Sequence, residues 1–196
     1  MKLMSPMERP IPVDIIPSHA YLSEQDQVTL FGIGHPMTIL TNHVQAGQFI
    51  YDETVEIFGR LKRSLPVHVL GPNWEKSHVE VTPIEAQFLG LNLDEVKTGR
   101  LDSAAPCRLV GPQGEVVLAH GLIVPKPHLT MNLDDAHRLN VQNGEQISVV
   151  LIGEHERQLD DVIVRVHPTF RLRLELHQGY ARDLWISRPT HARLLT

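Results

Sequence analysis

Cysteine, long apolar runs and basic clusters are scarce in this sequence. Cys107 is the only cysteine among the 196 residues, which excludes an internal disulfide and suits a reducing compartment. No apolar run approaches the ~20 residues that a membrane-spanning helix needs. The longest basic cluster is Arg60-Leu-Lys-Arg63, in a chain with 18 basic and 23 acidic residues. We therefore expect a cytoplasmic protein whose partners are neither nucleic acids nor membranes.

Glycine and proline divide the chain into many short segments with a strand-like pattern. The first ten residues, MKLMSPMERP, lack the apolar core of a signal peptide, and we expect residues 1–11 to be a short disordered lead. Evenly spaced short strands favour a sandwich or small barrels, with a boundary near Gly121. The predicted strands include Thr54–Phe58, Val67–Leu70, Arg108–Val110, Glu115–Leu118, Gln146–Ile152 and Asp161–Val166.

One pattern occurs three times in the chain. It consists of a histidine, a second side chain two residues later, a Ser, Thr or Asn, and an acid three residues after that. Its members are His19, Tyr21, Ser23 and Asp26; His78, Glu80, Thr82 and Glu85; and His128, Thr130, Asn132 and Asp135. A repeat of this kind predicts a repeated supersecondary unit.

The second half of each copy predicts the start of a short helix. A Ser, Thr or Asn followed three residues later by an acid is the capping-box pattern or its weaker Asp form. Short apolar segments precede the copies, so each unit is expected to be a strand, a turn and a helix, with the histidine at the end of the strand. Because residues i and i+2 of a strand share a face, each histidine should lie beside the residue two positions later. We take these faces as the candidate site.

Five stretches of the chain match the motifs of one family. On these motifs the chain resembles the PduL-type phosphotransacylases, also called phosphate propanoyltransferases, from about residue 11 to residue 186. The resemblance implies a mainly β fold of two small β-barrels capped by short helices, here residues 12–121 and 122–196. The stretches are Gly47-Gln-Phe with Glu53-Thr-Val, Leu70-Gly-Pro with Val79-Glu-Val81, Leu109-Val-Gly-Pro-Gln-Gly114, Ile123-Val, and Asp135-Ala with Leu139.

The resemblance also implies an activity and a setting. Members of this family convert acyl-CoA and phosphate into acyl phosphate and coenzyme A, with zinc held by histidines and a carboxylate. A homodimer in the bacterial cytoplasm is implied as well. Many members associate with bacterial microcompartments through an N-terminal helix, and the sequence shows no pattern for such a helix.

The chain departs from the family at the metal-binding motifs. The family's Arg-His-x-His becomes Ser18-His-Ala-Tyr21 in one motif and Pro127-His-Leu-Thr130 in the other. A later family histidine falls on Glu175, and the acid two residues beyond it falls on His177. Tyr21 and Thr130 are poor replacements for zinc-binding histidines.

One remodelled zinc site is nevertheless expected. Zinc usually takes three or four protein ligands from histidine, cysteine and carboxylate side chains. His19, Glu80 and His128 stand where the family has ligands, and the fourth ligand would be His78, Glu175 or His177. The alternative is that these polar residues remain from an ancestral site and bind no metal.

Phosphate recognition is altered as well. Trp74 stands where the family places a phosphate-contacting arginine after Gly71-Pro72, and a lysine cannot reproduce the bidentate contact of an arginine. Lys76 and Lys126 are candidates for a partial replacement. Trp74 itself would stack on a base, close an apolar pocket, or serve only as a core or interface residue. These three residues form the predicted substrate-binding set, and no residue is assigned as catalytic.

Three functions are consistent with these observations. The first is a phosphate acyltransferase with a remodelled zinc site. The second is an inactive relative that acts as a binding or assembly subunit, and the third is a metal-dependent hydrolase of acyl thioesters. Turnover of acyl-CoA with phosphate separates the first from the others, and metal content separates the third from the second.

Overall fold

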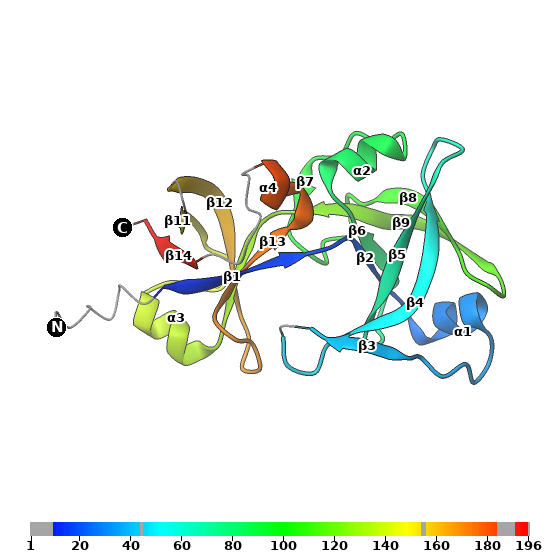
Figure 1. Ribbon diagram of the computed structural model, residues 1–196, viewed down its shortest axis with the longest axis horizontal. Coiled ribbons are helices and arrows are strands. Elements are labelled where there is room, and N and C mark those ends of the chain that lie inside the picture. The colour runs from blue at the N-terminus through cyan, green and yellow to red at the C-terminus, as the bar shows by residue number, and fades with distance from the viewer. Residues whose placement is uncertain (1–9, 44, 154–155, 184–190, 196) are drawn as a thin grey trace. The chain divides into compact units, whose positions relative to one another are not determined.

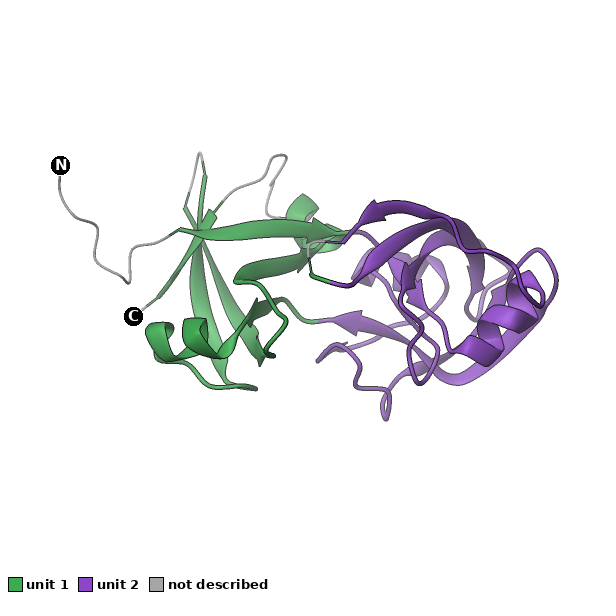
Figure 2. Ribbon diagram, turned by 90° about the horizontal axis from the view of Figure 1, so that it is seen from below, with its two compact units in different colours: residues 1–16, 44–46, 126–196 green, residues 17–43, 47–125 purple. Residues whose placement is uncertain are grey.

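The computed structural model describes residues 10–43, 45–153, 156–183 and 191–195 (Figure 1). The chain divides into two compact units, each built from more than one chain segment. Unit 1 comprises residues 1–16, 44–46 and 126–196, and unit 2 comprises residues 17–43 and 47–125 (Figure 2). Most of the expected disordered lead, residues 1–9, lies outside the described residues.

Unit 1 is a closed barrel with the strand order β1–β13–β10–β12–β11–β14. Strand β1 pairs in parallel with β13, while β14 lies antiparallel to both β1 and β11. Helix α3 follows β10, and helix α4 follows β13. The elements are β1 Ile11–Ile16, β10 His128–Met131, α3 Leu133–Leu139, β11 Gln146–Ile152, β12 Arg157–Val166, β13 Arg173–His177, α4 Gln178–Asp183 and β14 His191–Leu194.

Unit 2 follows the strand order β3–β4–β5–β2–β6–β9–β7, and β8 pairs with both β4 and β9. This double pairing closes a second six-stranded barrel, β4–β5–β2–β6–β9–β8. The predicted fold, mainly β with two small barrels and short helices, is confirmed. The elements are β2 His19–Tyr21, α1 Glu24–Phe31, β3 Ile39–Asn42, β4 Phe49–Phe58, β5 Ser64–Gly71, β6 His78–Glu80, α2 Pro83–Phe88, β7 Glu95–Val96, β8 Ala105–Val110 and β9 Glu115–Pro125.

The two units differ from the linear segments 12–121 and 122–196 that the sequence suggested. Strand β1 precedes unit 2 in the chain, yet it pairs with strands of unit 1 in the registers Val13↔Leu174 and Ile11↔Ala192. Residues 44–46 also belong to unit 1. Unit 2 ends at Pro125, four residues beyond Gly121. The spacing of short strands along the chain carries no information about pairing between strands far apart in the sequence.

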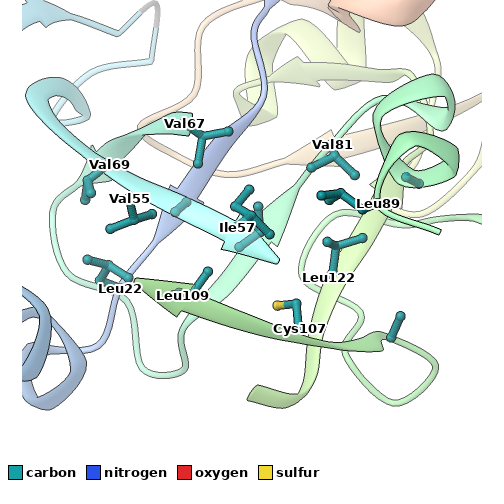
Figure 3. Close-up of a cluster of buried hydrophobic side chains, with 14 of the residues drawn as sticks. Leu22, Val55, Ile57, Val67, Val69, Val81, Leu89, Cys107, Leu109 and Leu122 are labelled. Atoms are coloured by element: carbon teal, nitrogen blue, oxygen red, sulfur yellow. The ribbon is translucent and has the colours of Figure 1, made fainter. Parts of the chain in front are cut away.

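The side chains of the barrel strands alternate between a buried core and the opposite face. In unit 2 the core includes Val55 and Ile57 of β4, Val67 and Val69 of β5, and Leu109 of β8 (Figure 3). Unit 1 has a separate core of the same kind, formed by residues of β1, β10, β11, β12, β13 and β14. Burial of apolar side chains therefore stabilises each barrel from within.

The same alternation places the repeated histidines away from the cores. Ala20 of β2 and Val79 of β6 belong to the unit 2 core, and Leu129 of β10 belongs to the unit 1 core. The residues on either side of each core residue therefore point to the opposite strand face. This explains why the histidine and the residue two positions later share one face in all three copies.

The three predicted helix starts are confirmed. Ser23 Oγ accepts a hydrogen bond from the Asp26 amide, and Asn132 Oδ1 accepts one from the Asp135 amide. Thr82 and Glu85 form a complete capping box. Each histidine begins a separate short strand rather than ending the preceding one. Among the described residues, none of the helices combines the length and the apolar character needed to cross a membrane.

Candidate functional site

In unit 2, antiparallel pairing of β2 with β6 brings the polar residues of two repeat copies together. His19 lies opposite Glu80, and Tyr21 lies opposite His78. The Nε2 atom of His19 is 3.7 Å from Glu80 Oε2, and the Nε2 atom of His78 is 3.9 Å from Glu80 Oε1. All three charged or ionisable side chains are buried. We call His19, His78 and Glu80 the unit 2 triad.

Both imidazoles of the triad are anchored in the same way. His19 Nδ1 lies 2.8 Å from the Pro17 carbonyl oxygen, and His78 Nδ1 lies 3.1 Å from the Lys76 carbonyl oxygen. A carbonyl oxygen only accepts, so each Nδ1 carries a hydrogen and each neutral ring keeps a lone pair on Nε2. Burial lowers the pKa of His78, against the opposing effect of the Lys76 hydrogen bond. This fixed tautomer is the one in which histidine ligates a metal through Nε2.

Aromatic rings surround the triad. Tyr21 stacks on His78 at a centroid distance of 4.6 Å and meets His19 edge-on at 4.9 Å. The ring of Trp74 is 4.9 Å from that of Tyr21 and 38% of the residue surface is exposed. The Trp74 amide donates to the Leu22 carbonyl oxygen at 2.8 Å. Trp74 is therefore a fixed, half-exposed apolar wall of the triad.

In unit 1, pairing of β10 with β13 places His128 opposite Glu175. His128 Nε2 is 3.0 Å from Glu175 Oε2. The amide nitrogen of Gln45 donates to Thr130 Oγ1 at 2.7 Å and to Glu175 Oε1, while its oxygen accepts from the Arg171 amide at 3.1 Å. We call Gln45, His128, Thr130 and Glu175 the unit 1 network, and all four residues are buried.

The predicted ligand residues thus gather in two places. His19, His78 and Glu80 meet in unit 2, whereas His128 and Glu175 meet in unit 1. A zinc site shared by His19, Glu80 and His128 stays a prediction, because these residues belong to different units.

Three of the predicted site residues have other surroundings. His177 is buried at the end of β13, in register with Ile16. Lys76 is exposed and Lys126 is half-buried. Their backbone carbonyl oxygens face the Nδ1 atoms of His78 and His128, respectively, and a role for their ammonium groups in substrate binding stays a prediction.

Gln45 is the functional candidate that sequence reasoning missed. It lies 85 and 130 residues from its partners Thr130 and Glu175, and no local pattern links positions so far apart. The only available signal is its place two residues before the Gly47-Gln-Phe stretch that resembles the family motif.

Cys107 takes no part in either cluster. It lies in the core of unit 2 (Figure 3), where burial raises the pKa of its thiol to about 12. The thiolate is the nucleophilic form of cysteine, so this side chain does not act as a nucleophile near neutral pH.

Zinc suits the donors of unit 2 better than those of unit 1. Within the described part of the chain, no group of three His, Cys, Asp or Glu side chains is already arranged to coordinate a metal ion. The unit 2 triad still offers the donor set zinc prefers: two anchored imidazoles with a carboxylate between them. In unit 1 both ring nitrogens of His128 and both oxygens of Glu175 already face hydrogen-bond partners. The donors of unit 1 are therefore less open to a metal than those of the unit 2 triad.

Comparison with known proteins agrees with the geometry and the motifs. The family model described as "Phosphate propanoyltransferase" matches residues 12–182. The chain belongs to the phosphate propanoyltransferase family. The phosphate propanoyltransferase of Citrobacter freundii is 36% identical over 183 residues, which cover 93% of this chain and 87% of the relative.

Other phosphate propanoyltransferases are similar to the same extent. That of Salmonella typhimurium is 33% identical over 183 residues, covering 93% of this chain and 87% of the relative. That of Clostridioides difficile is 31% identical over 185 residues, covering 94% and 88%, respectively. The resemblance expected from the five motifs is confirmed. Membership in the phosphate propanoyltransferase family implies coenzyme A thioesters and phosphate as substrates.

Proposed function

We propose that this protein transfers the acyl group of an acyl-CoA thioester to inorganic phosphate, giving an acyl phosphate and free coenzyme A. The observation that supports the proposal best is the buried Glu80 carboxylate between two imidazoles, each anchored in the ligand tautomer. Family membership supplies the reaction. The unit 2 triad would hold one zinc ion and leave a coordination position open, as catalytic zinc sites do.

The chain's own residues prepare this site in three ways. The Nδ1 hydrogens of His19 and His78 are held by backbone carbonyls, so the rings keep their orientation. Burial excludes water from the Glu80 carboxylate, and Trp74 adds an apolar wall. When bound, zinc supplies Lewis acidity toward an oxygen of the substrate. In the transfer itself a phosphate oxygen bonds to the acyl carbon, the carbon–sulfur bond breaks, and the leaving thiolate takes up a proton.

A second candidate is hydrolysis of the thioester, with water as the acceptor in place of phosphate. The observation that favours it is the indole of Trp74, which lies 4.9 Å from the ring of Tyr21 in a tilted contact. The family resemblance places a phosphate-contacting arginine at this position. An indole offers a dianion neither the charge nor the paired donors of a guanidinium. In this case the sulfur again leaves with a proton, but the product is a free acid.

The test follows thioester consumption with and without phosphate, using release of free thiol and trapping of acyl phosphate with hydroxylamine. Phosphate-dependent formation of the hydroxamate supports the transferase. Phosphate-independent thiol release supports the hydrolase, and no turnover under either condition contradicts both and favours a binding or assembly subunit. We expect Glu80→Gln to lower the rate by about 10²–10³, the usual effect of losing one well-placed electrostatic contact. The exposed His137→Gln serves as the matched control.

Trp74→Arg gives a sharper test of the acceptor. If Trp74 weakens phosphate binding, the arginine variant should lower the KM for phosphate in the transferase assay while the KM for acyl-CoA stays the same. Equal KM values for phosphate in both proteins would mean that this position does not meet the acceptor.

Assembly and cellular association stay predictions. A homodimer is expected from the resemblance, as is association with a bacterial microcompartment, and sedimentation analysis of the purified protein tests the first. The acyl chain length would be established by comparing thioesters of increasing length in the same assay.

A further inference from the structure

The side-chain amide of Gln45 can be oriented without ambiguity. The Arg171 backbone N–H donates at 3.1 Å to one end of the amide, which must therefore be the oxygen. The nitrogen end then donates its two hydrogens, to Thr130 Oγ1 at 2.7 Å and to Glu175 Oε1. A single buried amide thus fixes two side chains of the unit 1 network at once.

Glu175 is consequently held from both sides. One oxygen accepts from Gln45 and lies 3.1 Å from Thr130 Oγ1, and the other lies 3.0 Å from His128 Nε2. His128 Nδ1 faces the Lys126 carbonyl oxygen at 3.2 Å. Both ring nitrogens are therefore engaged by oxygen atoms of the protein, and neither is open to a metal while this arrangement persists.

The corresponding strand pairs of the two barrels share a histidine–glutamate pair but differ in the residue pair that follows it. In unit 2 the His19↔Glu80 pair is followed by Tyr21↔His78, so a second imidazole flanks the carboxylate. In unit 1 the His128↔Glu175 pair is followed by Thr130↔Arg173.

Arg173 is occupied elsewhere in unit 1, since its guanidinium forms an ion pair with Asp14 at 3.2 Å. At this position unit 1 therefore has Arg173 where unit 2 has the imidazole of His78. The distances agree with this difference. His128 is within hydrogen-bond reach of Glu175, whereas the triad imidazoles lie 3.7 and 3.9 Å from Glu80, beyond that reach.

We propose that unit 1 binds no metal. A directly hydrogen-bonded His128–Glu175 pair, positioned by Gln45 and Thr130, stands where the family resemblance implies a metal site. The inference deepens the proposed function, because any metal-dependent chemistry then depends on the unit 2 triad alone. It does not require that the transferase activity exist, since metal content is measured independently of turnover. Gln45 and Thr130 act as positioning residues for Glu175.

The first experiment measures zinc by elemental analysis in protein expressed with added zinc and dialysed. We expect about one zinc per chain in the parent protein, the same content in His128→Ala and Glu175→Gln, and loss of the zinc in His19→Ala and Glu80→Gln. Loss of metal in either unit 1 variant would overturn the inference, as would about two zinc ions per chain. A parent protein with no zinc would support the inference for unit 1 while contradicting the zinc site proposed for unit 2.

A gain of metal provides the complementary test. The double variant Thr130→His with Glu175→His restores the histidines that the family resemblance places at these positions. We expect it to bind about one zinc more than the parent, and to show an added visible absorption band when cobalt replaces zinc. A folded double variant with unchanged metal content would mean that these two residues are not what excludes the metal. Circular dichroism and the single Glu175→His variant show whether the fold is kept.

The positioning role of Gln45 has its own spectroscopic readout. In protein labelled with ¹⁵N-histidine, the His128 Nε2–H should give a downfield proton signal that is lost in Glu175→Gln. Gln45→Ala should shift or broaden this signal, and Gln45→Glu should not restore it, because a carboxylate cannot donate to Glu175. A signal that is unchanged in Gln45→Ala would contradict the role of Gln45.

Discussion

At the scale of single residues, the burial of His78 makes the stability of the fold depend on pH. The side chain is 0% exposed, and burial lowers the pKa of its ring from the ordinary value of 6.5. Below pH 6.5 the unfolded chain therefore binds a proton that the folded protein does not bind. The free energy of unfolding should fall as the pH decreases from 6.5 toward the lowered pKa, and this loss is absent above pH 6.5.

Urea unfolding of metal-free protein between pH 7.5 and pH 5 measures this dependence. We expect His78→Gln to reduce the slope of stability against pH relative to the parent protein. The exposed His137→Gln should leave the slope unchanged. Parallel curves for the parent and His78→Gln would show that the ring is not held neutral in the fold.

Much of the candidate site could be predicted residue by residue, for a specific reason. His19, His78 and His128 occupy equivalent positions of a repeated pattern, with Glu80 two residues after His78. The strand periodicity of two placed each of them on a definite face. Gln45 could not be found in this way, because it reaches the unit 1 network from a segment outside the repeats. The pairing of His128 with Glu175 depends on the register of β10 against β13, which the sequence does not specify.

At the scale of elements, the capping box of α2 is a local feature that the structure shows in full. Thr82 Oγ1 accepts from the Glu85 amide at 3.1 Å, and the Glu85 carboxylate accepts from the Thr82 amide at 2.9 Å. We expect Thr82→Ala to lower the free energy of unfolding by about 1 kcal/mol, the usual effect of losing an N-cap. Thr82→Ser keeps the hydroxyl and should lose less. Chemical denaturation of the three proteins would decide, and equal losses for Ala and Ser would argue against the cap.

Helix starts were predictable because the cap and the acid lie three residues apart in the sequence. Strands were predictable where they alternate, as in β4 and β11. The short strands β2, β6 and β10 were expected only as the ends of longer ones, because three or four residues are too few to show an alternating pattern. Elements β3, α4 and β14 were not predicted, since β3 is exposed along its length and the others carry no clear periodicity.

At the scale of the whole molecule, β14 completes the barrel of unit 1. It pairs with β1 on one side and with β11 on the other. Removing residues 191–196 would leave two unpaired strand edges and an opened core, which favours aggregation. We expect the truncated protein to bind a hydrophobic dye and to unfold with a smaller m-value than the parent.

Removal of Thr196 alone is the control, because it lies beyond the last residue of β14. This variant should unfold like the parent in urea. Cooperative unfolding of the longer truncation with the parent's m-value would show that unit 1 closes without β14.

The chain segments that make up each unit also favour an order of folding during synthesis. Unit 2 needs little beyond residues 17–125, so its barrel can form while the rest of the chain is still on the ribosome. Strand β1 is made before unit 2, but its partners β13 and β14 are made after unit 2. Contacts between such distant segments form slowly because a long loop must close. Strand β1 therefore stays unpaired until these partners have been made, and its exposed edges are a part of the nascent chain that a chaperone would protect.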